Sequence, residues 1–178
     1  MHSFKLKIIL VGLSNRDNKD FFQSFFRGFF KKRFALDYKF SIGVDILTKD
    51  VEFKPGELAT LSVWDISKQN RFNFIHDIFF RGATGAVLIF DLMKEQTYKE
   101  SRKWLEEIRQ ITQEEIPFLL IGFKSQVEKM IDINKIREFA EKEKGIFVEL
   151  ASKKSEDLDK AIYDLTRRII DSRNDKSL

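Results

Sequence analysis

The chain has 178 residues, of which 43% are hydrophobic and 34% charged, and this composition predicts one globular domain rather than a disordered or repetitive chain. The absence of cysteine excludes disulfides, thiolate metal sites and thiol-linked lipids, and two histidines argue against a conventional metal site. The 32 basic and 28 acidic residues are interspersed, which argues against nucleic-acid binding. Without a membrane-length apolar run or a signal-peptide pattern, we expect a cytoplasmic protein with no intrinsic membrane anchor.

The first third of the chain carries a strand, a helix and a hairpin pattern. The segment over residues 4–11 ends in a continuous apolar run from Ile8 to Val11 and stops at Gly12, which is typical of a buried parallel strand. Strand-like runs over residues 44–54 and 58–64 flank Pro55-Gly56 and predict an antiparallel hairpin. Between the first strand and this hairpin, phenylalanines with i, i+1, i+4 spacing predict a helix. Its apolar stripe covers about half of the helix circumference. The stripe is formed by Phe21, Phe22, Phe25, Phe26, Phe29 and Phe30.

Helix and strand patterns alternate through the rest of the chain. Gly145 is predicted to end a helix, because the C-terminal end of a helix favours a residue in the left-handed conformation. Ser155 is predicted to cap the last helix, and residues 171–178 read as a polar tail. In chain order, the patterns predict a helix over residues 72–81, a strand over 85–90, a helix over 95–112, a strand over 116–121, a helix over 132–144, a strand over 146–150 and a final helix from 155.

Strands that alternate with helices predict an α/β fold. We expect a mostly parallel six-stranded sheet with one antiparallel hairpin and helices on both faces. The prediction is a single domain over residues 1–172, followed by a polar tail over residues 173–178. Ligands of such sheets bind beside the carboxyl ends of the strands. The predicted functional loops therefore begin at Gly12, Asp65, Gly122 and Leu150.

Motifs along nearly the whole chain resemble the Ras superfamily of small GTPases, and in particular its Rab branch. Residues 7–12, Lys-Ile-Ile-Leu-Val-Gly, resemble the strand before the phosphate-binding loop, and residues 41–45, Ser-Ile-Gly-Val-Asp, resemble the first switch. Residues 64–72, Trp-Asp-Ile-Ser-Lys-Gln-Asn-Arg-Phe, are similar to the second switch. The resemblance implies a small GTPase fold of the P-loop NTPase type. Further similar segments are residues 79–85, 87–91, 103–108, 120–126 and 149–153.

The phosphate-binding loop departs from the family pattern, G-x-x-x-x-G-K-[ST]. In that pattern the second Gly lets the backbone approach the phosphates, the Lys supplies positive charge and the hydroxyl binds magnesium. Counted from Gly12, these three positions hold Asp17, Asn18 and Lys19. The Asp17 carboxylate would repel a phosphate. A shift of one residue would make Lys19 the phosphate lysine, but Asp20 would then replace the hydroxyl.

The other two ligand loops depart from the family as well. The guanine-binding motif Asn-Lys-X-Asp is replaced by Phe123-Lys124-Ser125-Gln126, which removes the carboxylate that accepts hydrogen bonds from guanine. Lys68 replaces the second-switch Gly whose backbone N–H meets the terminal phosphate. The positions that keep a matching residue type are Ser41 and Asp65 as magnesium ligands, Gln69 as the residue that orients the hydrolytic water, and Lys124, Ser152 and Lys153 around the base.

These departures weaken the predicted nucleotide site. Loss of the phosphate lysine and the guanine-binding carboxylate alone would remove about 3–6 kcal/mol, or about two to four powers of ten in affinity. We therefore interpret the chain as a Rab-like pseudo-GTPase, a protein-interaction module with lost or much weakened GTP binding and no expected cofactor. Its protein partner would bind the former switch regions, with Phe72 and Phe74, and the phenylalanine-rich first helix. The alternative is a divergent GTPase that binds GTP or GDP with magnesium and slowly hydrolyses GTP as a molecular switch.

Overall fold

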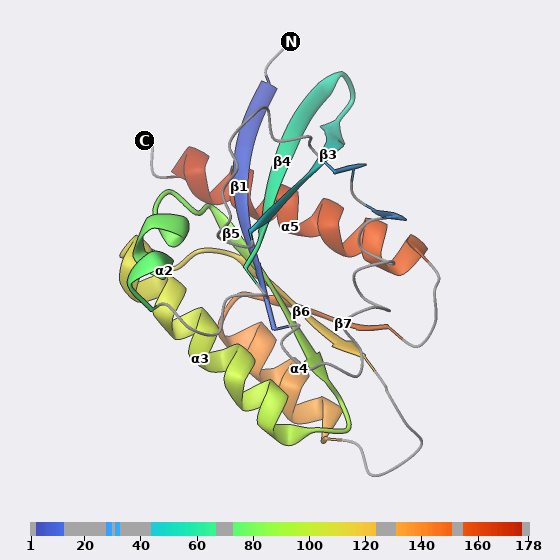
Figure 1. Cartoon of the computed structure of the whole chain (residues 1–178). Coiled ribbons are helices and arrows are strands. Elements are labelled where there is room, and N and C mark those ends of the chain that lie inside the picture. Colours follow the sequence, from blue (N-terminus) through green and yellow to red (C-terminus); the bar gives the residue numbers. More distant parts are fainter. Residues whose placement is uncertain are drawn as a thin grey trace.

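The computed structural model describes residues 3–12, 28–29, 31–32, 44–66, 73–123, 131–150 and 155–175. Their strands form one sheet in the order β2-β3-β4-β1-β5-β6-β7 (Figure 1). In chain order the elements are β1 (Ser3–Val11), β2 (Lys31–Lys32), β3 (Asp45–Lys54), β4 (Glu57–Asp65), α2 (Asn73–Phe80), β5 (Gly85–Asp91), α3 (Glu95–Thr112), β6 (Phe118–Phe123), α4 (Ile133–Lys142), β7 (Ile146–Leu150) and α5 (Ser155–Asp175).

The sheet confirms the predicted α/β fold class. β1 runs parallel to β4 and β5, and β6 runs parallel to β5 and β7. β3 and β4 form the predicted antiparallel hairpin, whose turn needs the positive φ of 77° at Gly56. The two-residue β2 adds a short antiparallel edge to β3 beyond the six predicted strands. The sequence around Lys31 and Lys32 carries no strand pattern, so this edge strand was not predicted.

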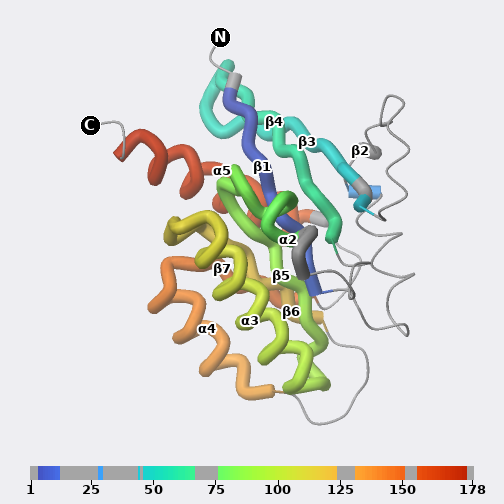
Figure 2. Tube along the Cα trace, turned by 60° about the vertical axis from the view of Figure 1, so that its left-hand side comes forward, coloured from blue at the N-terminus to red at the C-terminus, as the bar shows by residue number. Residues whose placement is uncertain are grey.

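Two apolar layers cover the two faces of the sheet. α5 packs on one face, where Leu6, Ile8 and Leu10 of β1 point toward it. α2, α3 and α4 pack on the other face, which Ile9 and Val11 line (Figure 2). All residues of β5 and β6 are buried, as continuous apolar runs predict for strands covered on both sides. Helices therefore lie on both faces of the sheet, as expected.

The end of α4 differs from the prediction. Lys144, with a φ of 59°, takes the left-handed position there, so the assignment of that conformation to Gly145 was wrong. The backbone N–H groups of Lys144 and Gly145 donate to Glu141 O (3.1 Å) and Ala140 O (2.7 Å), the two bonds of a Schellman motif. Gly145 is needed for another reason. A Cβ at this position would lie 2.3 Å from the Phe118 ring of β6.

Two further boundaries are shifted along the chain. β6 begins at Phe118 rather than at residue 116, because Pro117 has no backbone N–H to donate to the sheet. α5 continues through Asp175, so residues 171–175, which were predicted as polar tail, are helical. The side chain of Ser172 contributes to this last turn by donating to Ile169 O (2.9 Å). The division of the chain at residues 172 and 173 remains a prediction.

Candidate functional site

The carboxyl ends of five parallel strands meet at one edge of the sheet. Gly12 follows β1, and Asp65, Asp91, Phe123 and Leu150 are the last residues of β4, β5, β6 and β7. The strand register places Leu10 beside Asp65, and Phe123 between Asp91 and Leu150. Three predicted site residues, Gly12, Asp65 and Phe123, therefore lie along the edge at which ligands of parallel sheets bind.

Gly12 is fixed by the close approach of β1 and β5. Its φ is 105°, a conformation that favours glycine. A Cβ at this position would lie 2.0 Å from the carbonyl oxygen of Ile89, so a larger residue would push the two strands apart. The packing of the sheet by itself is therefore enough to require glycine here.

Asp65 places a buried carboxyl group at the same edge. Asp65 is 6% exposed. The backbone N–H of the next residue, Ile66, donates a hydrogen bond to Leu10 O at 3.0 Å. This bond continues the pairing of β4 with β1 past the end of the strand and holds Asp65 in place. Carboxylate oxygen is a ligand that magnesium prefers. Among the described residues, no group of three or more His, Cys, Asp or Glu side chains could form a metal site.

Phe123 offers no polar group to this edge. Phe123 is 9% exposed, and its side chain belongs to the apolar layer that packs on α5. The backbone carbonyl of Phe123 accepts a hydrogen bond from Leu92 N at 2.8 Å. The position that the family fills with Asn is thus occupied by a ring that contributes to the core.

The loop between β5 and α3 was missed by the sequence analysis. Asp91 is buried at the end of β5, and its Oδ1 accepts a hydrogen bond from Met93 N at 2.9 Å. Thr97 Oγ1 accepts from Asp91 N (2.9 Å) and donates to Lys94 O (2.7 Å). Short polar side chains that bond nearby backbone groups are typical of turns. The sequence signal for this turn is an Asp at the end of a buried strand followed by a Thr six residues later.

The other predicted site residues lie outside the described residues, as does most of the phenylalanine stripe. Phe29 is half-buried, and Lys49 Nζ lies 3.4 Å from the centroid of its ring. The side chain of Phe74, on α2, is also outside the described set, as is Phe72. The undescribed site residues are Asp17, Asn18, Lys19, Ser41, Lys68, Gln69, Lys124, Gln126, Ser152 and Lys153.

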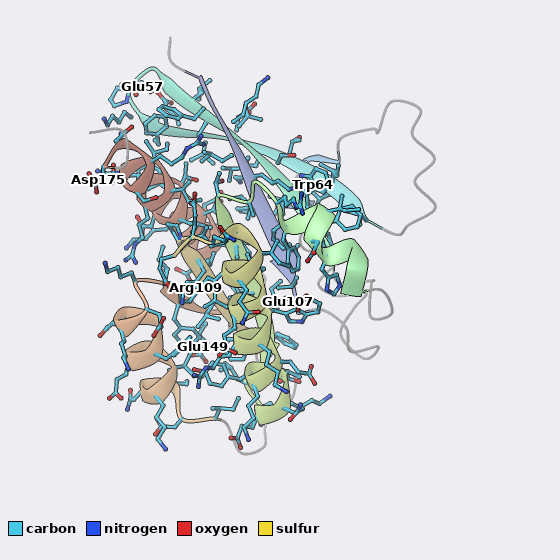
Figure 3. The ribbon with its side chains drawn as sticks, turned by 90° about the vertical axis from the view of Figure 1, so that its left-hand side faces the viewer. Glu57, Trp64, Glu107, Arg109, Glu149 and Asp175 are labelled. Atoms are coloured by element: carbon cyan, nitrogen blue, oxygen red, sulfur yellow. The ribbon has the colours of Figure 1, made fainter. Side chains whose placement is uncertain are left out.

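A second feature lies where β4 meets α2. The Trp64 ring, beside α2 in Figure 3, is 5.9 Å from the Phe79 ring, and both residues are half-buried. Lys7 Nζ lies 4.2 Å from the Trp64 ring centroid and donates to Arg81 O at 2.8 Å. Burial lowers the pKa of the Lys7 amine below its ordinary value. Ile78, 68% exposed, projects from α2 into solvent. We call Trp64, Ile78 and Phe79 the α2 surface.

Comparisons with known proteins agree with this architecture. The Ras family model matches residues 7–171. The chain is 29% identical to the Ras-related protein Rab-11A of Dictyostelium discoideum, over 94% of this chain and 77% of that protein. It is 29% identical to RABA4b of Arabidopsis thaliana over 98% and 77%, and 30% identical to Rab11A of Lotus japonicus over 98% and 76%. No helix within the described ranges is long and apolar enough to cross a membrane. The chain therefore belongs to the Ras family, among the Rab-like small GTPases.

Proposed function

We propose that this protein is a Rab-like protein-interaction module in which guanine-nucleotide binding is lost or much weakened. The observation that carries the proposal is Phe123, which is buried at the end of β6 and packed in the layer beneath α5. The Asn of the family motif can donate and accept hydrogen bonds at this position, whereas the phenyl ring can do neither. Gln126 adds to this argument, because a neutral amide replaces the family's guanine-binding carboxylate.

Family membership implies GTP or GDP with magnesium. Some residues at the edge of the sheet are chemically suited to these ligands, and others are not. The buried carboxyl group of Asp65 is chemically suited to magnesium. Phe123 is not suited to guanine, and the glycine at position 12 is already required by Ile89. The sequence also places Asp17 and Asn18 where the phosphate loop needs Gly and Lys. We therefore assign no step of GTP hydrolysis to these residues.

The α2 surface supports a protein partner. Half-buried aromatic rings next to an exposed aliphatic side chain are typical of interfaces, because association removes apolar area from water. Trp64 and Phe79 supply the rings, and Ile78 supplies the exposed side chain. The end of β4 lies in the segment that resembles the second switch, residues 64–72, and α2 directly follows that segment. In the proposed function, the partner binds here and also contacts the phenylalanine-rich segment over residues 21–30, for which the sequence predicts a helix.

Nucleotide content tests the proposal directly. The purified protein is heat-denatured, and the supernatant is analysed by anion-exchange chromatography against GDP and GTP standards. We expect far less than one guanine nucleotide per chain, because the affinity lost at the base and phosphate loops would let nucleotide dissociate during purification. A GTPase loaded with one GDP per chain and denatured in the same way serves as the reference. Close to one nucleotide per chain would contradict the proposal and favour the divergent GTPase.

A further inference from the structure

A buried histidine lies on the inner face of α2. The side chain of His76 is 3% exposed, and its Nδ1 lies 2.8 Å from Oε1 of Glu107 on α3. Its ring stacks on Phe80, with centroids 5.3 Å apart and planes 19° apart, and meets Trp104 edge-on at 5.0 Å. Figure 3 shows Glu107 on the stretch of α3 next to α2. One side chain of α2 thus combines aromatic packing with a polar contact to α3.

The Glu107 contact satisfies a buried polar group. A carboxylate can only accept, so Nδ1 carries the hydrogen and donates it to Oε1. Nε2 is buried and has no hydrogen-bond partner in the part of the chain that the structure describes. Glu107 therefore provides the polar contact of the imidazole. Without its carboxylate, Nδ1–H would be buried and unpaired, which costs more free energy than the bond itself contributes.

The C-terminal end of α2 has an anchor of its own. Lys7 Nζ donates to Arg81 O, directly after α2, at 2.8 Å. The backbone N–H of Thr84 then donates to Lys7 O at 2.8 Å. These bonds connect the end of α2 to β1. Like the contact between His76 and Glu107, they are made entirely by groups of this chain.

We propose that His76 is a positioning residue that fixes α2 on α3, so that the α2 surface stays formed whether or not a guanine nucleotide is bound. This rests on the proposed function, in which the α2 surface binds a protein partner. A ligand shifts a conformational equilibrium only through different affinities for the two states. A helix that is already held by His76 and Lys7 leaves a nucleotide little to change. Partner binding through this surface is then constitutive.

Hydrogen exchange of the backbone amides of residues 77–81 tests this inference. The full chain is measured nucleotide-free and with excess magnesium and either GDP or a non-hydrolysable GTP analogue. We expect slow exchange at these amides in all three samples. Glu107→Ala should accelerate it about tenfold or more, because it leaves a buried donor unpaired. Glu107→Gln keeps an acceptor oxygen and should stay close to wild type. Glu106→Ala, at an exposed neighbouring position, is the matched control.

Two outcomes would overturn the inference. One is fast exchange at residues 77–81 without nucleotide together with protection by nucleotide. The other is equal exchange in Glu107→Ala and Glu106→Ala. If Glu107→Ala does not fold, His76→Phe replaces it, since a phenyl ring keeps the packing on Phe80 and needs no polar partner. Its amides should exchange faster than wild type, and wild-type exchange would contradict a role for the hydrogen bond. Nucleotide found in the purified protein would refute the proposed function, whereas the exchange comparison would still decide the role of His76.

Discussion

At the residue scale, the burial of Phe123 matters as much as its chemistry. An aromatic ring on a surface could stack against a purine base even without hydrogen bonds. This ring instead faces the layer beneath α5 and is 9% exposed, so little of its face is presented to a ligand. The position contributes to the core of the domain. Under the proposed function, Phe in place of the family's Asn therefore removes one interaction without providing another.

Restoring the family motif should restore part of the affinity. We expect Phe123→Asn combined with Gln126→Asp to tighten guanine-nucleotide binding about tenfold or more, because a hydrogen bond to a charged group contributes about 1.5–3 kcal/mol. Titration of a fluorescent guanine nucleotide, with GDP and ADP as competitors, measures this gain. Phe123→Leu combined with Gln126→Asn is the control. If the first variant melts like a folded protein and binds no tighter than this control, the assignment of the base loop is wrong.

Lys144 and Gly145 show what a sequence reveals about single residues. The pattern correctly predicted a helix that stops near a glycine. It placed the glycine in the left-handed position, but Lys144 occupies that position and Gly145 follows it. The true constraint on Gly145 is the ring of Phe118, which belongs to a distant part of the chain. Such contacts between elements are not visible in local sequence.

At the element scale, α5 packs against β5 where a large side chain on the helix meets a glycine on the strand. Gly85 opens β5, and an added Cβ there would lie 2.6 Å from Cδ1 of Ile169. Ile169 is fully buried in the layer between α5 and the sheet. The side chain on the helix thus fills the space that the glycine leaves on the strand. This pair forms a close contact between the long C-terminal helix and β5.

The energies of these two positions should be coupled. Ile169→Ala should lower the free energy of unfolding by about 2–5 kcal/mol through cavity formation. Gly85→Ala should lower it by about 1–3 kcal/mol through overpacking. In the double variant the new methyl group occupies part of the cavity, so the loss should be smaller than the sum. Urea denaturation measures all three variants, with the exposed Lys160→Ala as control. Additive losses would show that the two side chains do not share this space.

Most elements could be predicted because their patterns are local. The helix predicted over residues 95–112 coincides with α3, and the strand over residues 146–150 coincides with β7. β2 could not be predicted, because two lysines form a strand only where β3 offers an edge. The end of α5 was missed for a related reason. Residues 171–175 are polar, and their helical state follows from the buried turn before them.

At the scale of the whole molecule, the place of the candidate site could be predicted from topology alone. Parallel strands bring their carboxyl ends to one edge, and Gly12, Asp65 and Phe123 do lie there. What each residue does at the edge depends on contacts across the sheet. The approach of Ile89 to Gly12 and the core packing of Phe123 are long-range contacts, so the sequence did not predict them. The same holds for the contact between His76 and Glu107.

Catalysis provides the strictest test of the whole molecule, because GTP hydrolysis needs nucleotide, magnesium and water in place together. We expect no phosphate release above buffer in a multiple-turnover assay, even at high protein concentration. A GTPase whose phosphate release is measured in the same assay provides the positive control. Phosphate release that Gln69→Leu abolishes would support the divergent GTPase instead, since that variant removes only the residue predicted to orient water.

The close approach of Ile89 to Gly12 has a consequence for how degenerate members of a family are diagnosed. A glycine that the sheet itself requires will persist in any descendant that still folds, whatever happens to the ligand. If Gly12 is counted as a surviving part of a nucleotide site, the remaining ability of the chain to bind nucleotide is overestimated. Positions whose residue type the ligand itself requires carry more information about nucleotide binding. Under the proposed function, Asp17, Asn18 and Gln126 are therefore better indicators of nucleotide affinity than Gly12.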